Sequence, residues 1–285
     1  MKLIQVSDLH FVPPGTRLFG LDPRARLAAA IADINQHHGD AELCLFTGDL
    51  ADHGTPEAYQ ALREALAALR LPYRLLIGNH DDRDHFQSAF PEAPRDEHGF
   101  VQTVVASGAG DIVLLDTHEP GQASGSFCTQ RQAWLRARLA EAVRPVTIFM
   151  HHPPLDIGIP SLDRIGLVDK QGFAEVVTGV GPGAGAGAGP GVGPGAVGAG
   201  IRHIFFGHVH RPVSGSWRGI PYAALRSLVH QVPFDLVTES PVPYDHAPPA
   251  YNVIFLNADD TVVHLHEFLD TSRLPPGTER YTKAE

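Results

Sequence analysis

Residues 2–10 read KLIQVSDLH, an apolar run that ends directly in Asp8 and His10. Such a run has the composition of a buried β-strand, and the same pairing of apolar run and polar cluster recurs along the chain. The other clusters are Gly48-Asp49, Gly78-Asn79-His80-Asp81, His151-His152 and Gly207-His208-Val209-His210. Active sites in α/β sheets form at the carboxyl ends of the strands. Carboxylates, imidazoles and one amide at that edge predict a site for a hard-to-borderline metal ion.

Strand-like and helix-like segments alternate over the first half of the sequence, and the last third reads mainly as strands. One helix has a clear start, with Thr55 as its cap and Pro56 in its first turn. Thr129 and Gln132 are expected to form a capping box for a helix over Gln130–Glu141. This order predicts an α/β fold, α+β in the last third, in which two sheets lie between helices.

We expect residues 1–285 to form a single domain with two unusual segments. Residues 179–200 contain only Gly, Ala, Val and Pro, which predicts a flexible insertion. They lack the Lys and Ser or Thr of a phosphate-binding P-loop. Residues 232–250 are rich in proline but also contain Phe234, Leu236 and Tyr244, which are available to pack. We expect this second segment to be an ordered small cap or an oligomerisation element.

The chain has a formal net charge of −10, which argues against a nucleic-acid surface because phosphate backbones are bound by clustered Lys and Arg. A small phosphate substrate remains compatible, since two divalent ions would add about four positive charges in one place. Cys44 and Cys128 form no CxxC pattern, and no apolar run is long enough to cross a bilayer. The first strand begins at Lys2, which leaves no room for a signal peptide. We therefore expect a cytoplasmic protein without a nucleic-acid or membrane partner.

The polar clusters resemble, in order and spacing, the motif set of the calcineurin-like metallophosphoesterases, over about Lys2–Pro212. The resemblance implies a four-layer αββα sandwich and a hydrolase of phosphoric diesters. Within the family, the chain is most similar to the bacterial class III cyclic-nucleotide phosphodiesterases and the related glycerophosphodiesterases. Three softer signals carry that similarity: Gly78–Asp82, His151–Pro154 and Leu228–Pro233. The implied substrates are small phosphodiesters, either 3′,5′-cyclic nucleotides or glycerophosphodiesters.

The same resemblance implies two divalent metal ions, with the Asp49 carboxylate bridging them. The ligands of the first ion would be Asp8, His10, Asp49 and His210. The ligands of the second ion would be Asp49, Asn79, His151 and His208. Such sites accept Fe, Mn, Zn or Co, so the sequence does not fix the metal. The nucleophile would be a metal-bound hydroxide, because coordination lowers the pKa of water.

His80 directly follows a ligand and is expected to act in catalysis without binding metal. In the family, its counterpart contacts the phosphoryl group and stabilises charge or protonates the leaving oxygen, which suits an imidazole. His230 is a candidate for the substrate pocket, together with Asn79 and His80. His152 is expected to orient or pack against its neighbours, with metal binding as the alternative.

Asp81 and Asp82 are expected to cap the next helix, although a bond from one of them to a ligand histidine is an alternative. Arg211 is expected to be a solvated surface residue, with contact to a substrate phosphate as the alternative.

Other functions stay open on the sequence alone. A phosphomonoesterase or a nucleotide pyrophosphatase could use the same dinuclear site. A nuclease is disfavoured by the acidic charge. A binding scaffold with a decayed metal site would lack ligands, whereas every motif position carries a competent residue. By analogy with the family, we also expect a homo-oligomer, a dimer or larger, with contacts in the final third of the chain.

Overall fold

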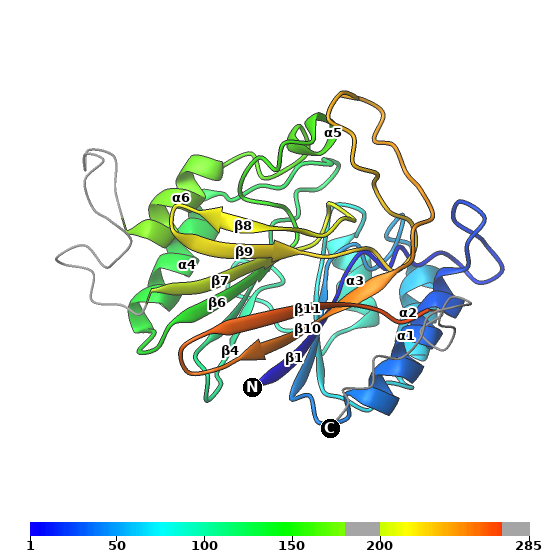
Figure 1. Ribbon diagram of the computed structural model, residues 1–285, viewed down its shortest axis with the longest axis horizontal. Helices are drawn as coiled ribbons and strands as arrows, with labels where there is room; N and C mark the ends of the chain where they lie inside the picture. Colours follow the sequence, from blue (N-terminus) through cyan, green and yellow to red (C-terminus); the bar gives the residue numbers. More distant parts are fainter. Residues whose placement is uncertain (180–199, 270–285) are drawn as a thin grey trace, which may run out of the picture.

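Two β-sheets lie face to face between layers of helices in the computed structural model, which describes residues 1–179 and 200–269 (Figure 1). The five-stranded sheet has the order β11-β10-β1-β2-β3, and the six-stranded sheet has the order β4-β5-β6-β7-β9-β8. Leu3 and Leu45 from the first sheet and Phe149 and Phe205 from the second belong to one buried apolar layer. The expected αββα sandwich is therefore confirmed.

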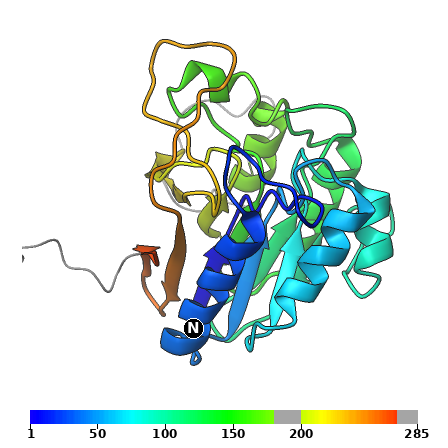
Figure 2. The same cartoon turned by 90° about the vertical axis from the view of Figure 1, so that its right-hand side faces the viewer.

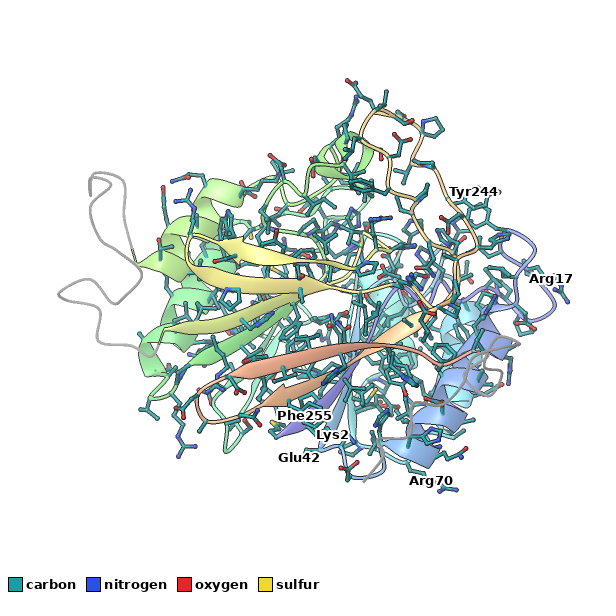
Figure 3. All side chains as sticks on the ribbon, viewed as in Figure 1. Lys2, Arg17, Glu42, Arg70, Tyr244 and Phe255 are labelled. Atoms are coloured by element: carbon teal, nitrogen blue, oxygen red, sulfur yellow. The ribbon has the colours of Figure 1, made fainter. Side chains whose placement is uncertain are left out.

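The five-stranded sheet is built around β1, which pairs in parallel with β2 and antiparallel with β10. Lys2 stands opposite Phe255 in that antiparallel pair (Figure 3). The strands are β1 (Lys2–Val6), β2 (Leu43–Thr47), β3 (Tyr73–Leu76), β10 (Ala250–Leu256) and β11 (Thr261–Glu267). Its outer face packs against α1 (Pro23–His37), α2 (Pro56–Leu66) and α3 (Arg83–Ala89), as Figure 2 shows.

In the six-stranded sheet, four neighbouring strands run parallel, so their carboxyl ends share one edge. The strands are β4 (Thr103–Val105), β5 (Ile112–Leu115), β6 (Val146–Met150), β7 (Ile201–Phe206), β8 (Val213–Trp217) and β9 (Ile220–Ala224). The helices of this half are α4 (Thr129–Glu141), α5 (Pro160–Asp163) and α6 (Lys170–Thr178). Their apolar side chains cover the outer face of this sheet.

The two expected helix starts have different outcomes. Thr55 caps α2, because its Oγ1 accepts a hydrogen bond from the backbone N–H of Ala58 at 3.3 Å. The prediction of a capping box at Thr129 is wrong, because Thr129 is already inside α4 and Cys128 occupies the N-cap position. The Gln132 amide donates instead to the carbonyl of Phe127 at 3.0 Å.

The two unusual segments are placed differently. Nearly all of the predicted insertion at 179–200 lies outside the described residues. Residues 232–250 mostly form a long loop that leads into β10 and crosses the top of the view in Figure 1. Phe234 and Leu236 are 66% and 55% exposed there, so neither is buried within the chain, and the role of this segment stays a prediction. Within the described ranges, no helix combines the length and apolar character needed to cross a membrane.

Candidate metal centre

The seven predicted metal ligands come together where strands of both sheets end. Asp8 and His10 follow β1, Asp49 follows β2, and Asn79 follows β3. The six-stranded sheet supplies the remaining ligands, His151, His208 and His210. All are buried except Asn79, which is half-buried. The edge predicted from the sequence is therefore the edge where these side chains meet.

Five of these ligands have a left-handed backbone. The φ angles are 56° at Asp8, 43° at His10, 46° at Asp49, 66° at His208 and 47° at His210. Residues other than glycine rarely adopt this backbone conformation, and each such residue costs the folded state on the order of 1–3 kcal/mol. Such strain persists where the surrounding structure enforces it, which is typical of functional sites. The sharp turns at the strand ends aim these side chains at one another.

The first group of ligand atoms is centred on two imidazoles. His10 Nε2 lies 3.1 Å from His210 Nε2 and 3.6 Å from Asp49 Oδ2. His210 Nε2 lies 3.3 Å from Asp8 Oδ1. Their ligand atoms are all within 4.8 Å of one another, close enough to share one ion.

Hydrogen bonds on the far side of each ring fix the protonation of these imidazoles. His10 Nδ1 lies 2.9 Å from Asp52 Oδ1, and His210 Nδ1 lies 3.0 Å from the carbonyl of His230. Carboxylate and carbonyl oxygens only accept, so both Nδ1 atoms donate and both Nε2 atoms carry lone pairs. Asp8 Oδ2 is buried without a hydrogen-bond partner in the described part of the chain. A cation satisfies such converging acceptors, so the residues fit a metal ion.

The second group shares Asp49 with the first. His151 Nε2 lies 3.3 Å from Asp49 Oδ2 and 3.2 Å from Asn79 Oδ1, while His208 Nδ1 lies 2.9 Å from Asn79 Oδ1. His151 Nδ1 donates to the Thr47 carbonyl at 2.9 Å, so the ring is oriented with its Nε2 towards Asp49 and Asn79. One oxygen, Asp49 Oδ2, thus faces His10 in one group and His151 in the other, so this carboxylate would be available to both groups.

Charge in the pocket also favours a cation. Burial would raise the pKa of Asp8, but His210 and His151 lower it to about 2. The pKa of Asp49 lies well below its usual value despite burial, chiefly because of His151 and His80. Both groups are therefore carboxylates at neutral pH. Burial would lower the pKa of His151, but Asp49 and Asp8 raise it to about 9, so the pocket attracts positive charge.

His80 lies beside these ligands and remains accessible, with 40% of its side chain exposed. Its backbone N–H donates to Asp49 Oδ1 at 2.9 Å, and its Nδ1 donates to the Asp52 carbonyl at 2.8 Å. Its ring is 4.6 Å from that of His10. These bonds hold the ring at the mouth of the centre and leave Nε2 available to a bound molecule.

Three aromatic rings, those of His230, Phe19 and Tyr244, form what we call the rim of the candidate metal centre. The His230 ring lies 4.5 Å from the His210 ring and 4.7 Å from the Phe19 ring. Phe19 stacks on Tyr244 at 4.1 Å, and the two side chains are 41% and 51% exposed. Figure 3 shows Tyr244 next to the loop that carries Arg17. The sequence singled out His230 but not Phe19 as a rim residue, because the two loops are remote in the chain.

Asp81 was expected to cap α3, and this is wrong. Asp82 is the cap, since its Oδ1 accepts from the His85 N–H at 2.8 Å. The buried Asp81 carboxylate instead accepts four hydrogen bonds, two of which join the loop after β2 to the loop after β3. The donors are the N–H groups of Leu50, Ala51 and Gly78 and the hydroxyl of Tyr59. Asp81 therefore holds the Asp49 and Asn79 loops together.

The sequence did not decide the roles of two polar residues, His152 and Arg211. The buried His152 ring lies 4.7 Å from that of His208, and its Nδ1 is 2.8 Å from Thr117 Oγ1. His152 Nε2 has no partner within the described ranges, and its nitrogen also falls within reach of His151 and His208. Packing or orienting thus remains the prediction for His152. Arg211 lies over the Phe234 ring at 4.9 Å.

Two motif glycines are required by close approach. A β-carbon on Gly78 would lie 2.3 Å from Asp49 Oδ1, and one on Gly207 would lie 2.1 Å from Ser7 Oγ. Both distances are far below van der Waals contact. Larger residues at these positions would displace the ligands.

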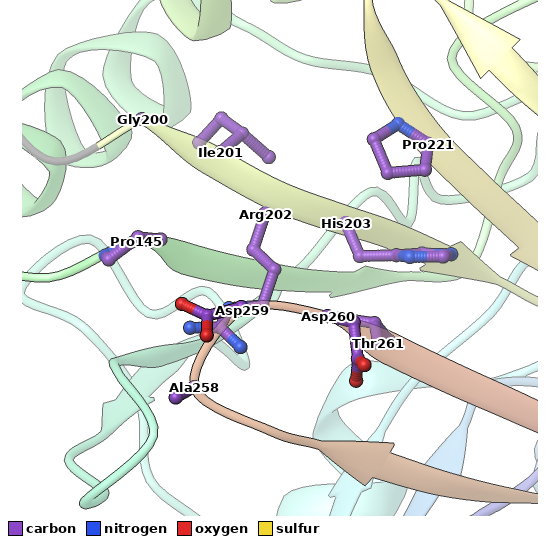
Figure 4. Close-up of a pocket in the computed structure, with 10 residues that line it drawn as sticks. All are labelled: Pro145, Gly200, Ile201, Arg202, His203, Pro221, Ala258, Asp259, Asp260 and Thr261. Atoms are coloured by element: carbon purple, nitrogen blue, oxygen red, sulfur yellow. The ribbon is translucent and has the colours of Figure 1, made fainter.

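A cavity of about 480 Å³ lies elsewhere, at the amino ends of β6 and β7 (Figure 4). Its wall includes Pro145, His203 and Thr261 and contains none of the predicted ligands. The ligand chemistry therefore lies at the opposite ends of these strands.

Comparison with known proteins agrees with this geometry. A family model described as calcineurin-like phosphoesterase matches residues 1–212. A relative from Rhodopseudomonas palustris, named probable cyclic nucleotide phosphodiesterase, is 42% identical over 94% of this chain and 93% of its own. A glycerophosphodiester phosphodiesterase of Enterobacter lignolyticus is 30% identical over 88% and 85%. The structure of a dimetal phosphatase from Danio rerio aligns with a TM-score of 0.67 at 13% identity, covering 94% of this chain and 96% of that one.

Proposed function

The chain belongs to the calcineurin-like phosphoesterases, and we propose that it hydrolyses 3′,5′-cyclic nucleotides at a centre that holds two divalent metal ions. The observation that carries this proposal is the shared position of Asp49 between two groups of facing acceptor atoms. One ion bound by each group would account for the lone pairs that converge there. The chemistry of carboxylate, imidazole and amide ligands is compatible with Fe, Mn, Zn or Co.

The ligand sets follow from the two groups. We assign the first ion to Asp8, His10, Asp49 and His210. We assign the second ion to Asp49, Asn79, His151 and His208. When bound, the ions supply Lewis acidity, which lowers the pKa of a water molecule and neutralises charge on the phosphodiester.

The surrounding side chains have separate tasks in this proposal. His80 donates through Nε2 to the phosphoryl group or to the leaving oxygen, because Nδ1 is held by the Asp52 carbonyl. Burial would lower the pKa of His80, but the Asp49 carboxylate and the Asp52 carbonyl raise it, which favours the donor form. Asn79 contributes a neutral oxygen, so the pocket gains no further negative charge.

The rim favours a substrate that carries a nucleobase. Phe19 and Tyr244 are exposed aromatic rings, next to His230 and therefore near the ligand rings. A base stacks on such a surface, with about 1–3 kcal/mol per base, whereas a glycerol group has no π-face. The 42% identical relative supports the same substrate class, and the 30% identical relative makes glycerophosphodiesters the second candidate.

The test is a side-by-side measurement of kcat/KM for 3′,5′-cyclic AMP, glycerophosphoethanolamine and p-nitrophenyl phosphate, with Mn²⁺-reconstituted protein. We expect the cyclic nucleotide to be preferred by at least tenfold. Preference for glycerophosphoethanolamine would replace the proposed substrate with the second candidate. A higher kcat/KM for p-nitrophenyl phosphate than for either diester would show that the protein is a phosphomonoesterase and would overturn the proposal.

Further properties belong to the same proposal. A second copy of the chain would cover the exposed apolar part of 232–250, where Val237 is 84% exposed, and light scattering of the purified protein tests this. Two free thiols, Cys44 and Cys128, support a reducing cytoplasmic location. The net charge of −10 supports a small-molecule substrate over a nucleic acid. We keep the single domain over residues 1–285 as part of this proposal.

A further inference from the structure

A further set of side chains that could bind a metal lies outside the two groups of candidate ligands that share Asp49, which we call the catalytic groups. Asp33 is on α1, His38 is its C-cap residue, and His266 is on β11. One ligand atom from each residue lies within 4.8 Å of the others, and none of the three belongs to the catalytic groups. We propose that these residues form a peripheral site for one divalent transition-metal ion of the zinc type.

The Asp33 carboxylate is held in place by its neighbours. Its Oδ2 accepts a hydrogen bond from the Tyr251 hydroxyl and lies 3.1 Å from His266 Nε2. Its Oδ1 lies 3.1 Å from His37 Nδ1, and the side chain is only 12% exposed. A fixed carboxylate loses little freedom when it binds an ion, which favours binding.

His38 supplies the independent observation. Its Nδ1 and Nε2 are both shielded from solvent, and neither has a hydrogen-bond partner in the described ranges. Leaving a buried polar atom without a partner costs free energy, and a metal bond would remove that cost.

The donor set determines the class of ion. Two imidazoles and one carboxylate are ligand types that suit Zn²⁺, which takes four ligands in structural sites. Hard ions such as Mg²⁺ and Ca²⁺ prefer oxygen ligands and are disfavoured here. His37 is half exposed beside Asp33, so it is available for the fourth position.

The location suggests what the ion does. β11 is the edge strand of its sheet and pairs only with β10 among the described strands. An ion bound between His266 and the end of α1 would tie this edge strand to a helix that packs on the same sheet. The site is therefore structural, and catalysis does not depend on it.

Zinc content per chain tests the proposal in the full-length, Mn²⁺-loaded protein. Wild type, His38→Gln and His266→Gln are equilibrated with Zn²⁺ and dialysed, and total metal is counted by mass spectrometry. The control is His264→Gln, an exposed histidine on the same strand whose ring faces Phe255 at 6.0 Å. We expect one ion fewer per chain in both variants than in wild type and the control.

Two further readouts follow the same comparison. Zn²⁺ should raise the Tm of wild type and the control, and slow amide exchange in β11, but do neither in the two variants. Phosphodiester hydrolysis should be equal in all four proteins. If His38→Gln does not fold, His266→Gln alone carries the comparison. Equal metal content in all four proteins, or loss in only one of two folded variants, would overturn the three-ligand site.

Discussion

His10 Nε2 and His210 Nε2 face each other at 3.1 Å, although the two residues are 200 positions apart in the chain. Each ring is turned into this position by a hydrogen bond from its other nitrogen, to Asp52 and to the His230 carbonyl. Two lone pairs at this distance repel unless a cation lies between them. Metal binding should therefore contribute to the stability of the fold as well as to catalysis.

We predict that Asp52→Ala weakens metal binding at the first group by about 10–100-fold, because the variant loses the acceptor that orients His10. Competition with a chelator measures the dissociation constants. Asp40→Ala is the control, since Asp40 is an acidic residue that bonds Lys2 at the surface. Unchanged affinity in Asp52→Ala would mean that packing alone orients the imidazole.

His80→Ala should lower kcat by about 10²–10⁴-fold while both ions stay bound, because His80 is assigned proton donation and no metal bond. Kinetics and metal analysis on the same preparation check this. His80 lies close enough to His10 and Asp52 to share an ion with them. Loss of metal in the variant would therefore identify His80 as a ligand and contradict the assignment.

Phe19→Ala and Tyr244→Ala should each raise KM for 3′,5′-cyclic AMP by roughly 5–100-fold, which corresponds to loss of base stacking. Metal content should not change, and hydrolysis of a glycerophosphodiester should be nearly unaffected. Phe234→Ala, an exposed aromatic residue of the same loop as Tyr244, is the control. Equal effects of all three substitutions would remove the stacking argument.

Asp81→Ala should destabilise the protein by several kcal/mol, because it leaves buried N–H groups of Leu50, Ala51 and Gly78 without their acceptor. Urea unfolding of the metal-free protein measures this. Tyr59→Phe removes the hydroxyl bond to the same carboxylate and the bond that this hydroxyl accepts from the Asp82 N–H, and it should cost about 1–2 kcal/mol. A loss in Asp81→Ala no larger than that in Tyr59→Phe would show that the loops do not depend on this carboxylate.

Burial lowers the pKa of His203 from 6.5 to about 4, and both of its ring nitrogens are buried without a partner in the described residues. Between these two values the unfolded chain binds a proton that the folded chain does not, so the free energy of unfolding falls as the pH falls. The loss from this group between pH 7 and pH 5 is about 2 kcal/mol. His203→Phe should remove that part of the pH dependence in urea unfolding curves. His264→Phe serves as the exposed control, and equal slopes in wild type and His203→Phe would contradict the prediction.

Much of the candidate centre could be predicted because each expected ligand lies within four residues of the end of a strand, and these strand ends share an edge. Asp8, Asp49 and His151 needed no more than that local rule. The choice between Asp81 and Asp82 as the helix cap depends on backbone geometry that two adjacent aspartates do not reveal. Contacts between remote loops, such as Phe19 with Tyr244, depend on how the loops fold over the rim. The left-handed φ angles at the candidate ligands have only a weak signal in the residue types, because aspartate and histidine are enriched in this region but adopt it in a small minority of cases.

The apolar layer between the sheets also determines the geometry of the centre. Asp8 and Asp49 follow strands of one sheet, and His151 and His210 follow strands of the other, so neither sheet alone supplies a complete set of ligands for either proposed ion. A slip of one sheet past the other by a single residue, about 3.3 Å, would separate every set at once. Side chains in this layer, such as the Phe149 and Phe205 rings stacked at 4.8 Å, thus fix the position of one sheet relative to the other and so keep the candidate ligands together. A substitution in this layer that leaves every candidate ligand in place would still weaken binding at both proposed metal sites together.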